Sequence, residues 1–165
     1  MRTSSFPDEI LAFVKTYVPI LEAIDADPVK KNWCRNYQGH STFLVAEPNH
    51  NFNVIQQTPP NDDLNLYKIV YDRLMSDAYE CELVNKYGPK YRELLTDHSI
   101  TEKKADLEQL QKLSDEQLLA IIAMQIRADY WCNGDLICQY VGDGLLLHYM
   151  RELFWRWFPE GIQIF

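Results

Sequence analysis

The stretch that decides the fold runs from Ser114 to Phe158, and its most apolar part is LLAIIAMQI at residues 118–126. Only Gln125 interrupts the aliphatic and small side chains of that run. A helix that is apolar nearly all round is enclosed by other elements. We therefore expect a central helix from Asp115 to about residue 131, with Ser114 as its N-cap.

A second helix pattern begins near Asp143-Gly144 and ends at Trp157-Phe158. Its apolar face carries leucine and aromatic side chains, and its polar face carries His148, Arg151, Trp155 and two further charged residues. Trp155 is an unusual side chain for a polar face. It is a candidate interaction residue, either as a surface pair stacked on Arg151 or as an anchor for a partner protein.

The rest of the chain reads as helices with one β-rich interval. An apolar stripe at helical spacing follows Phe6-Pro7 and reaches Ile24, and Pro19 inside it predicts a kink or a split. Two short β-rich runs with a Pro/Asn turn between them occupy residues 42–56. We expect a mainly α, single compact domain over residues 1–165, with about six or seven helices and a small β-hairpin or extended excursion near residues 42–56.

The composition of the chain limits the classes of binding partner and the cellular compartment that we expect. The net charge is −8 and the pI is about 4.9, so we expect no direct nucleic-acid binding. No run approaches the roughly 20 apolar residues that cross a bilayer, so we expect no membrane partner. The N-terminal residues lack the apolar core of a signal peptide, and the four cysteines have no CxxC spacing. These features favour a cytoplasmic protein with free cysteines.

Arg127 directly follows the apolar run, and a buried guanidinium needs an anionic or carbonyl partner. The acids nearest to it in the sequence are Asp129, Asp135, Asp143 and Glu152. One interpretation is a structural ion pair that ties the following turn to the last helix. The other is a ligand site in which Arg127, Asp129, Asp135 and His148 bind a small anion or perform acid–base chemistry.

The sequence favours a role other than catalysis. Cys132, Cys138 and His148 fit none of the common zinc spacings, so we expect no metal and no cofactor. Cys132 follows the C-terminal end of a helix, where the dipole raises the pKa of a thiol and disfavours a nucleophile. There is also no P-loop, GxGxxG, HExxH or GxSxG motif.

The segment around Arg127 resembles a bacterial family of uncharacterised proteins, the domain of unknown function number 6508. The similarity rests on Arg-x-Asp-x-Trp-Cys-Asn-Gly at residues 127–134 and on Gly-x-Leu-Leu…Arg-x-Leu at residues 144–153. Tyr130 stands where the family pattern has a second arginine, so a paired-arginine anion site is not implied for this chain. The resemblance implies a fold and a bacterial, cytoplasmic setting, and it carries no activity.

Three classes of function fit these observations. The first, which we favour, is a cytoplasmic protein-interaction module. The second is an acidic inhibitor, of the phage or mobile-element type, that blocks a nucleic-acid-binding enzyme. The third is a small-anion-binding protein or enzyme built around Arg127.

Overall fold

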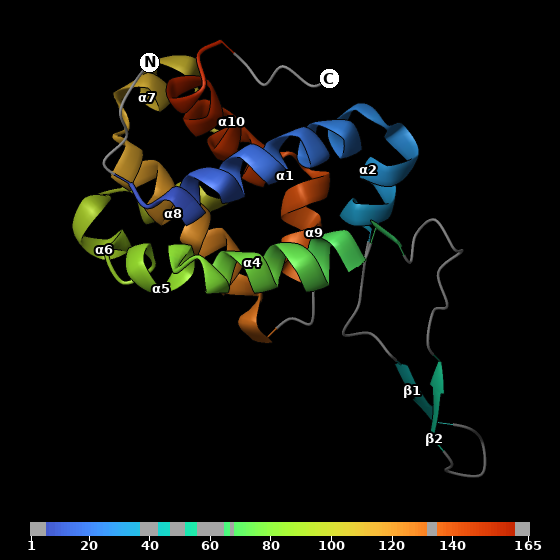
Figure 1. Cartoon of the computed structure of the whole chain (residues 1–165). Helices are drawn as coiled ribbons and strands as arrows, with labels where there is room; N and C mark the ends of the chain where they lie inside the picture. The colour runs from blue at the N-terminus through green and yellow to red at the C-terminus, as the bar shows by residue number, and fades with distance from the viewer. Residues whose placement is uncertain are drawn as a thin grey trace.

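The structure is a computed structural model that describes residues 6–36, 43–46, 52–55, 65–66, 68–131 and 135–160. The mainly α prediction is confirmed, and the apolar side chains form one core (Figure 1). In order, the helices are α1 Asp8–Ala26, α2 Pro28–Arg35, the π-helix η1 Lys68–Leu74, α4 Met75–Glu80, α5 Leu83–Tyr87, α6 Tyr91–Leu94, the 3-10 helix η2 His98–Glu102, α7 Leu107–Lys112, α8 Asp115–Arg127, the 3-10 helix η3 Ala128–Trp131, α9 Asp135–Gly142 and α10 Leu145–Trp157.

Helix α8 is the centre of the fold, as its apolar sequence predicts. Residues 118–123, Gln125 and Ile126 are all fully buried. The helix packs between α5 and α6 on one side and α10 on the other (Figure 1). Its first turn is closed by a capping box, because the Ser114 hydroxyl accepts from the Gln117 backbone N–H and the Gln117 side chain accepts from the Ser114 N–H.

The start of α8 is tied to α10 by Arg156. The guanidinium donates to the carbonyl oxygens of Leu113 at 2.7 Å and Leu110 at 3.0 Å, and to Asp115 at 3.0 Å. It also donates to Glu152 at 3.2 Å, and its side chain is only 18% exposed. A partly desolvated guanidinium with four such hydrogen bonds fixes the geometry of the elements it joins.

Two helices, α2 and α9, lie where the sequence analysis expects other structure, and the expected six or seven helices are therefore too few. Nine α-helices lie within the described residues. Helix α9 occupies the interval between the two helices that the stretch from Ser114 to Phe158 predicts. Asp27 caps α2 rather than only closing α1, since its carboxylate accepts from the backbone N–H groups of Val29 and Lys30.

These two helices pack against each other at close range. A Cβ added to Gly142 at the end of α9 would lie 2.5 Å from the backbone nitrogen of Arg35 at the end of α2. Cys34 and Cys138 are both fully buried, one on each helix. Only a residue without a side chain permits this approach, so Gly142 is a packing residue.

Helix α1 runs unbroken through Pro19, so the predicted split does not occur. Its buried face packs along α10, and Glu22 of α1 pairs with Arg151 of α10 at 3.2 Å. At the other end of this contact, the rings of Phe6 and Trp157 lie 5.5 Å apart. The first and last helices of the described chain are therefore neighbours in the fold (Figure 1).

Two short strands, β1 Phe43–Ala46 and β2 Phe52–Ile55, pair antiparallel with Phe43 opposite Ile55. They lie within the interval of residues 42–56, where the β-rich runs were noted. The turn between them lies outside the described residues.

Candidate functional site

Arg127 lies at the surface, which differs from the burial expected for it. It is the last residue of α8, and its side chain is exposed as the helix leaves the core. Of the predicted partners, Asp143 pairs with Arg35 at 3.1 Å and Glu152 pairs with Arg156 at 3.2 Å. Within the described residues no ion pair or hydrogen bond engages Arg127. The structural anchor expected at this arginine is formed by Arg156 instead.

Asp129 is buried and acts as a helix cap. Its Oδ1 atom accepts from the backbone N–H of Leu136 at 3.0 Å and of Ile137 at 3.1 Å, at the start of α9. A carboxylate at a helix N-terminus is stabilised by the dipole and by otherwise unpaired N–H groups. Asp129 therefore has a structural role that the sequence analysis did not anticipate. The side chain of Asp135 lies outside the described residues.

His148 holds a loop rather than completing a cluster with Arg127. Its Nε2 atom lies 2.7 Å from the carbonyl oxygen of Ala105, which can only accept, so Nε2 carries the proton. Its described contacts reach neither Arg127 nor Asp129. Among the residues that the structure describes, no group of three or more His, Cys, Asp or Glu side chains is arranged to hold a metal ion.

Of the cysteines that the structure describes, Cys34 and Cys138 are buried and Cys81 is partly buried. Burial, with added repulsion from Cys34 and Asp129, raises the pKa of the Cys138 thiol well above its usual range. Cys138 is therefore a protonated core residue at neutral pH. Cys132 lies outside the described residues.

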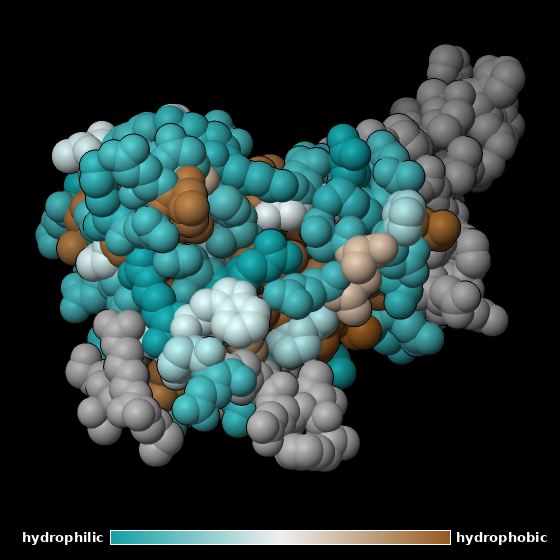
Figure 2. All heavy atoms as spheres, turned by 90° about the horizontal axis from the view of Figure 1, so that it is seen from above, coloured by the Kyte–Doolittle hydropathy of each residue, from teal (hydrophilic) through white to brown (hydrophobic). Residues whose placement is uncertain are grey.

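Trp155 is 50% exposed, and its ring packs edge-on against Phe154. Arg151 is engaged with Glu22 of α1, so the surface pair of Arg151 and Trp155 is not the arrangement seen. The other large exposed apolar side chains of the described residues, Val29 and Leu107, come from two other helices. Figure 2 shows hydrophilic side chains over most of the face viewed from above, with hydrophobic ones in small separate spots.

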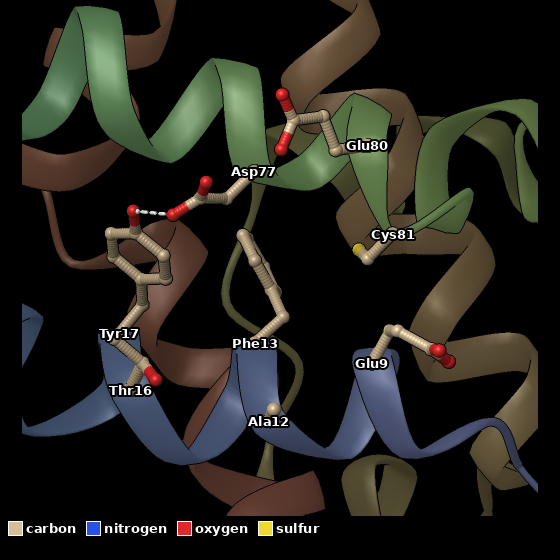
Figure 3. A pocket seen from close by; sticks show the side chains of 8 residues that line it. All are labelled: Glu9, Ala12, Phe13, Thr16, Tyr17, Asp77, Glu80 and Cys81. Carbon is tan, nitrogen blue, oxygen red and sulfur yellow. Dashed lines mark hydrogen bonds between the residues drawn. The ribbon is translucent and has the colours of Figure 1, made fainter.

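A groove between the first helix and α4, here called the α1–α4 groove, gathers acidic side chains over an apolar floor (Figure 3). Its volume is about 360 Å³. It is lined by Glu9, Ala12, Phe13, Thr16 and Tyr17 from α1, and by Asp77, Glu80 and Cys81 from α4 and the turn after it. Phe13 points from α1 towards α4, with Tyr17 on one side and Cys81 on the other (Figure 3).

The groove carries negative charge that its own lining does not neutralise. Tyr17 donates a hydrogen bond from its hydroxyl to Asp77, and burial followed by that bond raises the pKa of Tyr17. Glu9 and Glu80 are exposed, and no hydrogen bond or ion pair engages either of them within the described part of the chain. The described residues that line the groove include no lysine, arginine or histidine. Burial also raises the pKa of the Cys81 thiol, which is therefore neutral.

Sequence reasoning missed this groove. Glu9 is recognisable as an acid in the first turn of a helix, and Asp77 and Glu80 as part of a solvated helix face. Asp77 lies 60 residues from Tyr17 in the chain, and only the packing of α1 on α4 brings them together.

A second hollow, here called the Arg127 pocket, lies between the α4–α5 region and the end of α8. It has a volume of about 730 Å³ and is lined by Tyr79, Val84, Asn85, Pro89, Met124, Arg127 and Ala128. Arg127 is the one charged residue among those lining residues. The two sites thus have opposite charge.

Comparison with protein-family models, curated proteins and solved structures finds no match to this chain. The resemblance to the bacterial family therefore stays a prediction. In the described residues, every helix is too short or too polar to cross a bilayer.

Proposed function

We propose that this chain is a protein-interaction module that binds a basic segment of another protein in the α1–α4 groove. The observation that carries the proposal is a pair of exposed carboxylates above an apolar floor, Glu9 and Glu80, for which the described residues provide no partner. Unpaired like charges beside a hollow attract an oppositely charged group. The net charge of −8 adds long-range attraction for a basic partner.

The shape of the groove favours a lysine or arginine side chain over a simple cation. Long basic side chains place their methylene stems on apolar surface and their charged heads near anions. Phe13 and Ala12 offer that surface, while Glu9 and Glu80 offer the anions. Carboxylates from two different helices also require the ligand to bridge α1 and α4.

Acidic residues outside the groove are paired with lysines, which disfavours the alternative of an acidic inhibitor that imitates phosphates. Lys103 pairs with Asp97 at 2.6 Å, and Lys112 pairs with Glu108 at 3.0 Å. Within the acidic interval of residues 60–120, these lysines neutralise carboxylates that a phosphate mimic needs to display. A row of carboxylates imitating a nucleic-acid backbone is therefore less supported than a local basic-peptide site.

We also propose the cytoplasm as the compartment. Cys34, Cys81 and Cys138 are all free thiols, as expected for a reducing environment.

Selection of displayed random peptides on the recombinant protein tests the proposal, because it needs no knowledge of the partner. We expect selected peptides to be basic and to bind the Glu9→Gln/Glu80→Gln variant roughly tenfold or more weakly, from the loss of two charge-assisted contacts. Binding measured by calorimetry also weakens with salt.

The matched control is Glu93→Gln/Glu102→Gln, which removes two exposed acids outside the groove. This control lowers only the long-range attraction for a basic peptide, so its peptide affinity stays within about twofold of the wild-type value. Neutral or acidic selected peptides, or equal binding to both double variants, contradict the proposal.

A further inference from the structure

The Arg127 pocket has the chemistry of an anion site in an otherwise acidic protein. Its lining combines one guanidinium, the amide of Asn85, and the apolar side chains of Val84, Pro89 and Met124. Among the described residues that line it, none is an acid. Its volume of about 730 Å³ lies within the range of roughly 300–1,000 Å³ that is typical of small-molecule sites.

Gly88 lies beside the arginine of this pocket. A Cβ at residue 88 would lie 2.6 Å from the carbonyl oxygen of Val84, 3.7 Å from Nη1 of Arg127 and 3.8 Å from its Cδ. The aliphatic stem of Arg127 thus runs within van der Waals distance of Gly88, and a Cβ there would clash with the backbone carbonyl oxygen of Val84 but not with the arginine.

The donors of Arg127 and Asn85 are both open to a ligand. Within the described residues neither side chain makes a hydrogen bond or ion pair, although both line the same hollow. A guanidinium presents a planar fork of N–H donors that matches a carboxylate in bidentate fashion. The Asn85 amide adds one further donor for the same group.

We propose that the Arg127 pocket binds a small organic acid through its carboxylate, with the apolar part of the ligand against Val84, Pro89 and Met124. The apolar walls distinguish this ligand from inorganic phosphate, which has nothing to place against them. The pocket shares no lining residue with the α1–α4 groove, so either site can fail without the other.

Titration of the ¹⁵N-labelled protein with hexanoate, followed by NMR, tests the proposal. Hexanoate produces saturable shifts at the amides of Asn85, Met124 and Arg127. Hexanamide, which has the same chain without the charge, and inorganic phosphate, which has the charge without the chain, each bind roughly tenfold or more weakly.

Two variants test whether Arg127 and Asn85 bind the carboxylate. Arg127→Gln removes the fork, and Asn85→Asp places an acid in the pocket; each weakens hexanoate binding roughly tenfold or more. The matched control, Arg92→Gln, changes an exposed arginine outside the pocket and leaves binding unchanged. The absence of saturable hexanoate shifts, equal binding of hexanamide or phosphate, or wild-type affinity in Arg127→Gln overturns the proposal.

Discussion

The two ends of α8 are built in opposite ways. At its start, Ser114 and Gln117 close a capping box, and Arg156 of α10 binds Asp115 and two carbonyl oxygens before it. At its end, Arg127 is exposed, and no hydrogen bond or ion pair of the described residues engages it. One arginine is used to join elements of the fold, and the other borders a hollow.

This difference shows that the hydrogen-bond partners of an arginine separate a structural role from a ligand-binding one. A guanidinium whose donors are satisfied by backbone carbonyls and carboxylates stabilises the packing around it, and removing it leaves acceptors unpaired. A guanidinium without such partners contributes little to stability and keeps its donors for a ligand. Stability measurements on the two ends of α8 therefore separate structure from function.

The largest effect is expected from Arg156→Met. This change removes the guanidinium hydrogen bonds to the Leu110 and Leu113 carbonyl oxygens and to the Asp115 carboxylate, and we expect a loss of about 2–4 kcal/mol in the free energy of unfolding. Denaturation by urea measures it. Arg151→Met is the matched control, because its more exposed pair with Glu22 is worth at most about 1 kcal/mol. Similar losses in both variants would show that the start of α8 is not specially held.

A smaller effect is expected from Ser114→Ala. It removes the hydroxyl that accepts from the Gln117 N–H, so the capping box opens and the free energy of unfolding falls by about 1 kcal/mol. The same urea titration measures the change, and Ser114→Asp, which restores a capping acceptor, recovers most of it. An unchanged midpoint in the alanine variant contradicts a stabilising cap.

The smallest effect on stability is expected from Arg127→Gln. Because the side chain is exposed and has no partner among the described residues, the free energy of unfolding stays within about 0.5 kcal/mol of the wild type. The comparison is with Arg156→Gln at the other end of the helix, which loses its carbonyl and carboxylate contacts. A loss in Arg127→Gln as large as in that variant would return Arg127 to a structural role.

Local signals in the sequence predicted much of the organising segment. Ser114 is the N-cap of α8, and Gly144 precedes α10 with a φ of 77°, a conformation that glycine adopts without strain. Both predictions are confirmed because caps and turns depend on neighbours within a few residues. The apolar run at residues 118–126 likewise predicted the most buried helix.

The parts that were missed depend on contacts between distant segments. Arg156 reads in the sequence as one polar residue of an amphipathic helix, yet its partners lie at residues 110–115. The sequence suggests Asp129 as an ion-pair partner, yet its carboxylate caps α9 by accepting from Leu136 and Ile137. The α1–α4 groove joins residues 60 positions apart. The hydrophobic periodicity of a single helix does not predict contacts between such distant segments.

The contact between α1 and α10 has a consequence for synthesis of the chain on the ribosome. The apolar face of α1, including Ile10 and Val14, is covered in part by the last helix, and Phe6 meets Trp157. Since α1 emerges from the ribosome before α10, that face has no native partner until all the residues between the two helices have been translated. Contacts of such long sequence separation form slowly and leave apolar surface exposed to chaperones and to aggregation in the interval.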